Sequence, residues 1–306
     1  MVTLNTMNNN EPLVSVIVNC FNGEKYLEEC LRSIVNQTYD NWEIIFWDNH
    51  STDNSKKIFQ KFNDKRFKYY LSPRHSFLYE ARDLAIKVSN GDFIAFCDVD
   101  DFWSKDRLKF QIPLFKNKNI GVVYCNQWIL NDKDKKKKIL KKKIIPKGKI
   151  SSNIIRGSAV TILTALIRKS EYKNLEVGFN KKYQIIGDFD FFVRISKKCS
   201  FDFVQLPLVY YRLHDDNFTK KNRETELREL EEWYNDMQKD KSFFSKEELD
   251  LVSEIILYKK ITVFILKKQL QKSISHILKF PNNIKKLKLL VALILPRYIF
   301  EKVKNF

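Results

Sequence analysis

Three carboxylates stand at the end of an apolar run, in the string Phe93-Ile94-Ala95-Phe96-Cys97-Asp98-Val99-Asp100-Asp101. Charge at the end of a buried strand is costly unless a cation compensates it. Carboxylate oxygens are hard ligands suited to Mg²⁺ or Mn²⁺, and a cation held by one or two of them keeps open positions for diphosphate oxygens. The string therefore predicts a metal site, although an acidic turn before a helix would have the same composition.

The segments before these carboxylates alternate between two patterns. Apolar runs rich in β-branched and aromatic residues predict strands, whereas helical spacing of apolar residues predicts helices between them. Strands are expected at 13–19, 43–47, 67–71, 92–97, 122–130 and around 158–167, and helices at 24–36, up to 62, 79–89 and 189–196. Such alternation is typical of a parallel sheet covered by helices on both faces.

In sheets of this kind, ligands bind outside the carboxyl ends of the strands. Three polar segments directly follow predicted strands and should meet at that edge: residues 19–23, 48–53 and 98–101. No glycine-rich phosphate loop occurs in any of them, which disfavours a dinucleotide or P-loop site.

Residues 13–101 as a whole resemble the family 2 glycosyltransferases of the GT-A fold, which are typically inverting enzymes that use nucleotide sugars. The matching pieces, in order, are residues 14–22, 31–39, 47–53, 80–83 and 91–101. The resemblance implies an α/β fold with a GT-A (Rossmann-like) mixed, mostly parallel sheet flanked by helices, followed by a C-terminal helical appendage.

The same resemblance implies a site for the nucleotide-sugar donor. Its residues would be Asn19, Phe21, Asn22, Asp48, Arg82 and Asp98. An ionised Asp48 can only accept hydrogen bonds, which suits the imide N–H of uracil or thymine and favours a UDP- or dTDP-sugar. Arg82 would pair with Asp48 or with the diphosphate, or else form a surface ion pair. The segment 75–78 departs from the small, glycine-containing turn that is frequent in the family.

The resemblance also implies the catalytic groups. Asp100 would be the principal ligand of Mn²⁺ or Mg²⁺, with Asp101 a weaker candidate, and His214 would bind the metal or the diphosphate unless it is structural. Asp188 matches the base that takes the acceptor proton, with Asp190 the weaker candidate. An Asp at this position could instead cap the next helix. The family usually has Glu-Asp here, whereas this chain has Gly187-Asp188.

The length and composition of the chain allow one large α/β domain with an appendage. The 306 residues are 44% hydrophobic, which excludes general disorder. Of the net charge of +18, residues 131–149 carry +8 (ten Lys, two Asp) and residues 259–306 carry +11 (twelve basic residues, one Glu). The first of these segments is expected to be a solvated loop or hairpin. A nucleic-acid binder would place its basic residues on a recognisable reading element, and none is visible.

The basic tail mixes lysines with large apolar residues. Residues 216–258 predict charged helix, and residues 259–306 predict basic amphipathic helices broken at Pro281 and Pro296. The apolar run 289–295 is shorter than the roughly 20 residues that span a bilayer. Such helices either bind an anionic membrane surface or pack on the catalytic domain.

The five cysteines have no paired spacing, and residues 1–10 lack the pattern of a signal peptide. A cytoplasmic protein is therefore expected. The basic tail further predicts a peripheral location at the inner face of the cell membrane.

These observations predict a catalytic domain over residues 11–215, with a nucleotide-sugar half (11–130) and an acceptor half (131–215), followed by a basic helical region (216–306). The expected function is metal-dependent, inverting sugar transfer to a glycan or polyprenyl-linked acceptor, in the assembly of bacterial surface polysaccharide or lipopolysaccharide. A nucleotidyltransferase with the same acidic metal site is the alternative, and a nucleic-acid-binding protein is a weaker one.

Overall fold

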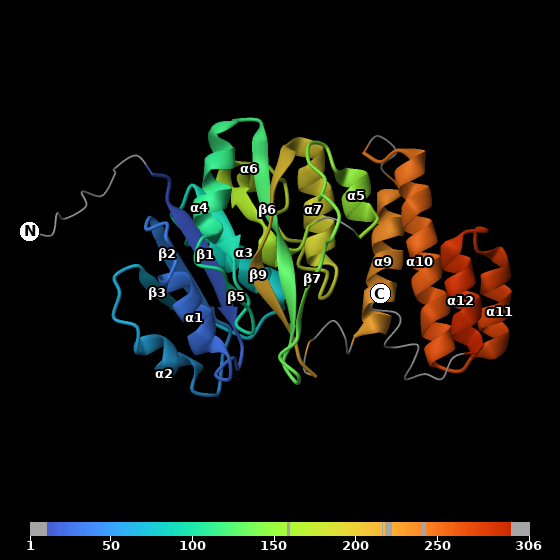
Figure 1. The fold of residues 1–306 in the computed structure, drawn as a ribbon, viewed down its shortest axis with the longest axis horizontal. Helices are drawn as coiled ribbons and strands as arrows, with labels where there is room; N and C mark the ends of the chain where they lie inside the picture. Colours follow the sequence, from blue (N-terminus) through green and yellow to red (C-terminus); the bar gives the residue numbers. More distant parts are fainter. Residues whose placement is uncertain (1–10, 158–159, 216, 218–221, 240–242, 295–306) are drawn as a thin grey trace, which may run out of the picture. The chain divides into compact units, whose positions relative to one another are not determined.

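The computed structural model describes residues 11–157, 160–215, 217, 222–239 and 243–294 (Figure 1). The chain divides into two compact units, residues 1–215 and 216–306.

The first unit is built on one mixed sheet. In its described residues nine strands form the order β3-β2-β1-β4-β8-β6-β9-β5, with β7 paired to β6. The strands are β1 (Val14–Cys20), β2 (Trp42–Asp48), β3 (Phe67–Leu71), β4 (Phe93–Phe96), β5 (Phe102–Trp103), β6 (Ile120–Asn131), β7 (Lys137–Ile139), β8 (Leu166–Arg168) and β9 (Ser200–Leu213). The helices are α1 (Leu27–Val35), α2 (Ser55–Gln60), α3 (Leu78–Lys87), α4 (Arg107–Gln111), α5 (Ser151–Ile155), α6 (Lys169–Lys173) and α7 (Gly187–Lys198), with 3₁₀ turns η1 (Ile112–Lys116) and η2 (Ile162–Thr164).

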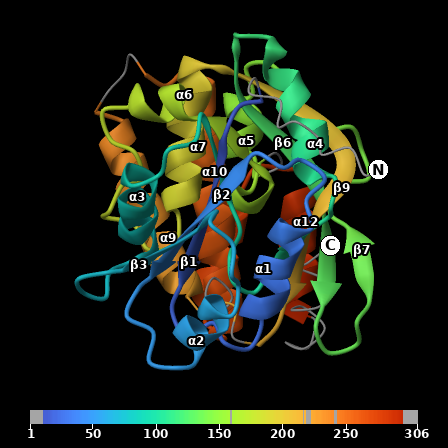
Figure 2. The ribbon, with the colours of Figure 1, turned by 90° about the vertical axis from the view of Figure 1, so that its left-hand side faces the viewer.

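The central strands are buried along nearly their whole length because helices cover both faces of the sheet. β2 is buried at every position, and β1 at all but one, the pattern of parallel strands without a solvent face. Figure 2 shows α1 and α3 on opposite sides of β1 and β2. The predicted mixed sheet flanked by helices is confirmed, and its longer pairings are the parallel ones.

The direction of the strands brings the carboxyl ends together. β1 runs parallel to β2 and β4. β8 runs antiparallel to both β4 and β6, so β4 and β6 point the same way, and β9 is parallel to β6. The carboxyl ends of β1, β2, β4, β6 and β9 therefore lie along one edge of the sheet.

Two sequence expectations differ from the observed elements. The strand expected around 158–167 is wrong over Ile162–Thr164, which form a 3₁₀ turn, and β8 is confined to Leu166–Arg168; residues 158 and 159 lie outside the described part. The long strand β9 was not predicted, because Pro207 and mixed polar residues interrupt its apolar pattern. It nevertheless pairs with β6 over most of its length, with register shifts where the strands adjust.

The second unit is helical. It comprises α9 (Arg223–Met237), α10 (Lys246–Leu266), α11 (Leu270–Lys279) and α12 (Ile284–Ile294). A capping box formed by Ser245 and Glu248 begins α10. The expected boundary between charged helix and basic amphipathic helices at residue 259 is wrong, since α10 continues through this residue. The expected break at Pro281 is found between α11 and α12, whereas Pro296 lies outside the described residues.

A small core of its own holds α10, α11 and α12 together. It consists of the buried side chains Ile261, Ile277, Phe280 and Leu289. None of the helices in the described ranges combines the length and the apolar character that crossing a bilayer requires.

The buried carboxylate of Glu43 joins three other segments of the chain. It lies at the edge of the sheet opposite the carboxyl ends of the strands. Glu43 on β2 accepts hydrogen bonds from Ser15 Oγ at 2.6 Å, the Asn90 amide at 2.6 Å and Lys68 Nζ at 2.5 Å. Burial raises the pKa of Glu43, but these donors outweigh it and hold the pKa below its ordinary value. Gly91 completes the contact, since its amide donates to Ser15 Oγ at 2.7 Å.

We expect Gly91→Ala to lower the free energy of unfolding by about 1–3 kcal/mol, the usual cost of overpacking. A Cβ at this position would lie 2.6 Å from Ser15 Oγ and 2.8 Å from Leu13 O, and the second contact is to backbone that has no freedom to move. Urea titration of the full chain measures the change.

The matched control is Gly148→Ala. Gly148 has a φ of +86° and open space around it, so alanine there carries only the cost of an unfavourable backbone angle, about 1 kcal/mol. Equal losses for the two variants would contradict the close packing at Gly91.

Candidate active site

Three aspartates crowd the turn after β4. Asp101 N donates to Asp98 O at 3.0 Å, which closes the turn. The Asp98 and Asp100 side chains remain partly exposed, whereas Asp101 is buried and accepts a hydrogen bond from the Arg212 amide at 2.7 Å. The turn thus presents two carboxylates to the ligand-binding edge and buries the third.

Burial and, after it, mutual repulsion disfavour the charged forms of Asp100 and Asp101. Burial, with added repulsion from Asp98, raises the pKa of Asp100 despite the hydrogen bond with His214. Burial and the charges of Asp100 and Asp98 raise the pKa of Asp101 well above its ordinary value. A bound cation would relieve this repulsion, which is the electrostatic character expected of a metal site.

The predicted metal ligands Asp100 and His214 lie together. His214 Nε2 is 2.9 Å from Asp100 Oδ2. Within the described ranges no cluster of three or more His, Cys, Asp or Glu side chains is arranged to hold a metal. One carboxylate and one imidazole, with the remaining positions left to diphosphate oxygens, nevertheless fit the way Mg²⁺ and Mn²⁺ bind beside phosphates.

Arg82 is buried, not a surface residue. Only 2% of it is exposed, and its guanidinium pairs with Asp98 Oδ1 at 2.8 Å. The expectations of a pair with Asp48 and of a surface ion pair are both wrong, because α3 carries Arg82 under the turn after β4. Its Nε has no hydrogen-bond partner in the described structure. Burial disfavours its charge, but Asp98 and neighbouring groups raise the pKa of Arg82.

Asp188 lies at the first turn of α7 and within the electrostatic reach of Arg82. Burial raises the pKa of Asp188, and the charge of Arg82 is the largest effect that opposes this rise. Ile186, not Asp188, is the residue before the helix. Asp188 Oδ1 nevertheless accepts a hydrogen bond from Phe189 N in the first turn at 2.8 Å, so the capping alternative holds in part. Asp190 is tied to Arg194 at 2.6 Å, which leaves Asp188 as the carboxylate with the character of a base.

Tyr79 on α3 contacts this carboxylate and was not predicted from the sequence. Its hydroxyl lies 2.8 Å from Ile185 O and 3.3 Å from Asp188 Oδ1, so one proton faces two acceptors. The Tyr79 ring also explains the departure from the family's Glu-Asp pair: a Cβ at Gly187 would lie 2.6 Å from ring carbons of Tyr79. A glutamate at position 187 therefore has no room while Tyr79 is present.

The other residues that were expected to bind the nucleotide-sugar donor lie at the ends of β1 and β2 and in the loop after β1. Asn19 and Asp48 end the neighbouring strands β1 and β2. Asp48 is buried and accepts from Ser51 N at 2.8 Å and Tyr69 Oη at 2.6 Å; each oxygen keeps a further lone pair. Asn19 Nδ2 is buried without a hydrogen-bond partner in the described residues.

Phe21 and Asn22 lie on the loop after β1. Phe21 is half exposed, and its ring lies 4.3 Å from the ring of His75. Asn22 has a φ of +54°, and its Oδ1 accepts from Thr52 N at 2.8 Å, so it joins two loops. His75 carried no sequence signal because only the fold brings it to Phe21.

Comparisons with known proteins identify the family and the fold. The family model described as "Glycosyl transferase family 2" matches residues 15–177. The chain is 30% identical over 158 residues to the Escherichia coli UDP-Glc:alpha-D-GlcNAc-diphosphoundecaprenol beta-1,3-glucosyltransferase WfgD. That alignment covers 52% of this chain and 61% of the relative.

A second relative is the putative teichuronic acid biosynthesis glycosyltransferase TuaG of Bacillus subtilis. It is 34% identical over 115 residues, which cover 37% of this chain and 46% of TuaG. The chain thus spans less than two thirds of either relative.

Solved structures resemble the fold over nearly the whole chain. The Staphylococcus aureus TarS 1–349 complex with UDP-GlcNAc has a TM-score of 0.63 at 18% identity, covering 95% of this chain and 91% of that chain. The mannosyltransferase PcManGT of Pyrobaculum calidifontis, in complex with GDP-Man and Mn²⁺, has a TM-score of 0.62 at 16% identity, covering 97% and 88%. This likeness establishes the GT-A fold.

We expect Tyr79→Phe to raise the pKa of Asp188, since the variant loses a hydrogen bond of 3.3 Å to the charged form. Carboxyl ¹³C NMR titration of the full chain measures the midpoint, and loss of the signal in Asp188→Asn assigns it.

Tyr172→Phe is the matched control, because it removes a hydroxyl that bonds to Asp83 instead. An unchanged midpoint in Tyr79→Phe, or an equal change in Tyr172→Phe, would contradict the contact.

Proposed function

We propose that this chain, which belongs to glycosyl transferase family 2, transfers a sugar from a nucleotide diphosphate to an acceptor hydroxyl with inversion at the anomeric carbon. The observation that carries the proposal is the position of Arg82. It pairs with Asp98 in the acidic turn and lies close enough to lower the pKa of Asp188. The acidic turn and the candidate base therefore belong to one site.

Asp188 supplies the proton acceptor in this mechanism. Its carboxylate takes the proton of the acceptor hydroxyl as that oxygen attacks the anomeric carbon. The bond from this carbon to the diphosphate oxygen breaks on the opposite face, and the electron pair leaves with the nucleoside diphosphate. Burial raises the pKa of Asp188, and the charge of Arg82 opposes this rise and so favours the ionised carboxylate.

A metal ion completes the proposed site. Asp100 and His214 would hold Mn²⁺ or Mg²⁺, and the bound cation would neutralise charge that develops on the departing diphosphate.

The donor is proposed to be a UDP- or dTDP-sugar. Asp48 offers acceptor oxygens for an imide N–H, and Asn19 Nδ2 is a donor without a partner in the described residues. Phe21, Asn22 and Asp98 are the other proposed contacts of the nucleotide sugar. The printed name of the relative WfgD gives UDP-Glc as its donor, which supports a uridine donor.

The acceptor is proposed to be a glycan or a polyprenyl-linked saccharide in bacterial surface polysaccharide or lipopolysaccharide assembly. The printed name of WfgD gives a diphosphoundecaprenol-linked acceptor, and that of TuaG gives teichuronic acid biosynthesis. Residues 11–130 would bind the donor and residues 131–215 the acceptor, with no nucleic-acid partner.

We expect the full chain to release UDP or dTDP from one member of a panel of nucleotide sugars when Mn²⁺ or Mg²⁺ and a polyprenyl-diphosphate saccharide are present. Asp100→Ala should lose the metal-dependent rate, and Asp188→Asn should lower kcat by about 10²–10⁴-fold, the usual contribution of a general base.

Asp190→Asn is the matched control, since its carboxylate is engaged by Arg194. It should reduce stability more than kcat. Release of pyrophosphate in place of the nucleoside diphosphate would identify a nucleotidyltransferase and overturn the proposal.

The second unit is proposed to bring the enzyme to the inner face of the cytoplasmic membrane. On α11, exposed apolar side chains recur every four residues, at Leu270, Ile274 and Leu278. On α12 the exposed apolar side chains are Ile284, Leu287, Leu290, Val291 and Ile294. Lysines accompany both rows, which suits apolar burial together with attraction to anionic lipid.

We expect the full chain to float with vesicles that contain phosphatidylglycerol and not with vesicles of phosphatidylcholine alone. The double variant Leu278→Glu/Leu287→Glu should bind at least about tenfold more weakly, because each buried leucine contributes about 1.5–3 kcal/mol.

Leu206→Glu is the matched control, a half-exposed leucine on β9. Equal flotation of all three proteins would contradict membrane binding through α11 and α12. Point variants are preferred to removal of residues 259–306, which would cut α10.

A further inference from the structure

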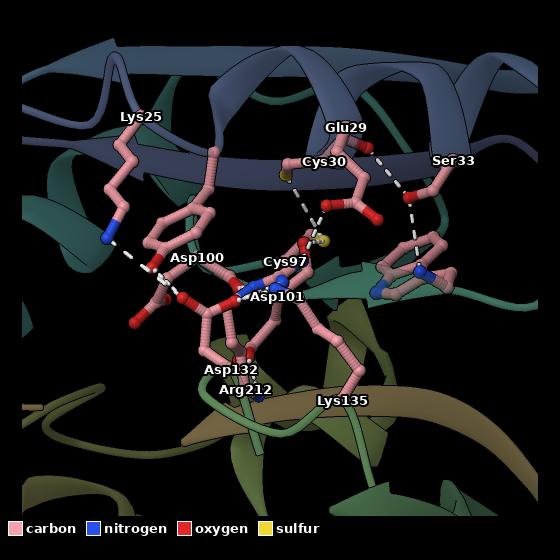
Figure 3. A network of polar contacts seen from close by, with 12 residues as sticks. Lys25, Glu29, Cys30, Ser33, Cys97, Asp100, Asp101, Asp132, Lys135 and Arg212 are labelled. Atoms are coloured by element: carbon pink, nitrogen blue, oxygen red, sulfur yellow. Dashed lines mark hydrogen bonds and ion pairs between the residues drawn. The ribbon is translucent and has the colours of Figure 1, made fainter. Parts of the chain in front are cut away.

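Arg212 is a buried arginine that the proposed reaction leaves without a role. It lies near the end of β9, is 4% exposed and is surrounded by acidic groups from three other segments (Figure 3). A buried guanidinium is costly unless its N–H groups are bonded. The hydrogen-bond partners of Arg212 therefore show which segments of the chain it joins.

Two of these bonds reach the acidic turn. Arg212 Nε donates to the backbone oxygen of Asp100 at 2.9 Å, and Arg212 N donates to Asp101 Oδ1 at 2.7 Å. His214 lies two residues further along the same segment and contacts Asp100 Oδ2 at 2.9 Å. Arg212 thus bonds to the main chain of one proposed metal ligand and stands beside the other.

The outer half of the guanidinium is anchored to two other segments. Nη2 donates to Glu29 Oε2 on α1 at 2.5 Å, and Nη1 donates to Asp132 Oδ1 after β6 at 3.1 Å. Asp132 is itself bonded by Lys135, by the Tyr26 hydroxyl and by Arg212, which together hold its pKa well below the ordinary value.

Aromatic rings fix the plane of the guanidinium. Its central carbon lies 4.6 Å from the Tyr26 ring centre and 5.4 Å from that of Phe102. The guanidinium of Arg212 has one orientation, because two rings fix its plane and its nitrogens bond to Asp100 O, Glu29 and Asp132. A lysine has a single nitrogen and cannot reach the Asp100 oxygen, Glu29 and Asp132 together.

We propose that Arg212 is a positioning residue that holds Asp100 and His214 at the separation from which they bind the metal, an inference that rests on the proposed function. Partners of this kind tune a metal through the residues that contact it, and their loss typically costs about 10–100-fold in metal affinity. The competing possibility is that Arg212 only joins β9 to its neighbours.

The test uses Arg212→Lys in the full chain. Free Mn²⁺ is measured by electron paramagnetic resonance with UDP at saturation, and the melting temperature is measured in parallel. Mn²⁺ binding should weaken by about 10–100-fold, and UDP affinity should return to the wild-type value at saturating Mn²⁺.

Arg168→Lys is the matched control. Arg168 also donates to two backbone oxygens, those of Ile120 and Phe115, and lies over two aromatic rings, but it is on β8 away from the acidic turn. It should lower the melting temperature and leave Mn²⁺ affinity unchanged. Glu29→Gln serves as a milder variant in case Arg212→Lys does not fold, since Glu29 is half exposed; it should weaken Mn²⁺ binding in the same direction.

The outcomes separate the two proposals. Wild-type affinity for Mn²⁺ in Arg212→Lys and in Glu29→Gln, with a lower melting temperature, would overturn the positioning role alone. Failure of the wild type to bind Mn²⁺ and UDP together would instead overturn the proposed function.

Discussion

The concentration of negative charge after β4 is the constraint on which the rest of the site depends. Three aspartates in one turn would repel each other and unfold the loop unless cationic and hydrogen-bonding groups met them from outside. The fold supplies these groups from separate elements: Arg82 from α3, and the Arg212 amide and His214 from the end of β9. Arg212 and His214 reach the turn because β4 and β9 end along the same edge of the sheet, whereas Arg82 reaches it from α3.

The first half of the fold and the acidic turn could be predicted from the sequence because their signals are local. Buried parallel strands read as continuous apolar runs, and polar residues directly follow them at 19–23, 48–53 and 98–101. The order of the strands in the sheet then determines which loops meet. Asp100 and His214 were expected at one metal site from a family resemblance, and the structure places them 2.9 Å apart; their role as ligands remains a prediction.

Other parts of the site could not be predicted, because they depend on contacts between distant segments. The partner of Arg82 is Asp98 and not Asp48, which follows from the depth at which α3 packs. Tyr79 reaches Asp188, and His75 reaches Phe21, without any pattern in the neighbouring sequence. The strand β9 was missed because its own apolar pattern is interrupted, while its place in the sheet depends on pairing with the distant strands β6 and β5.

The contact between Gly187 and the Tyr79 ring links the side chains that two positions far apart in the sequence can carry. A relative that carries glutamate at the position of Gly187 needs a smaller or displaced side chain at the position of Tyr79, because both cannot occupy the same space. A chimera that exchanges only the α7 segment would combine a glutamate with the tyrosine ring and clash. The reverse exchange, of α3 alone, would leave a hole beside a glycine. In this chain α3 and α7 are therefore coupled through the contact between positions 79 and 187.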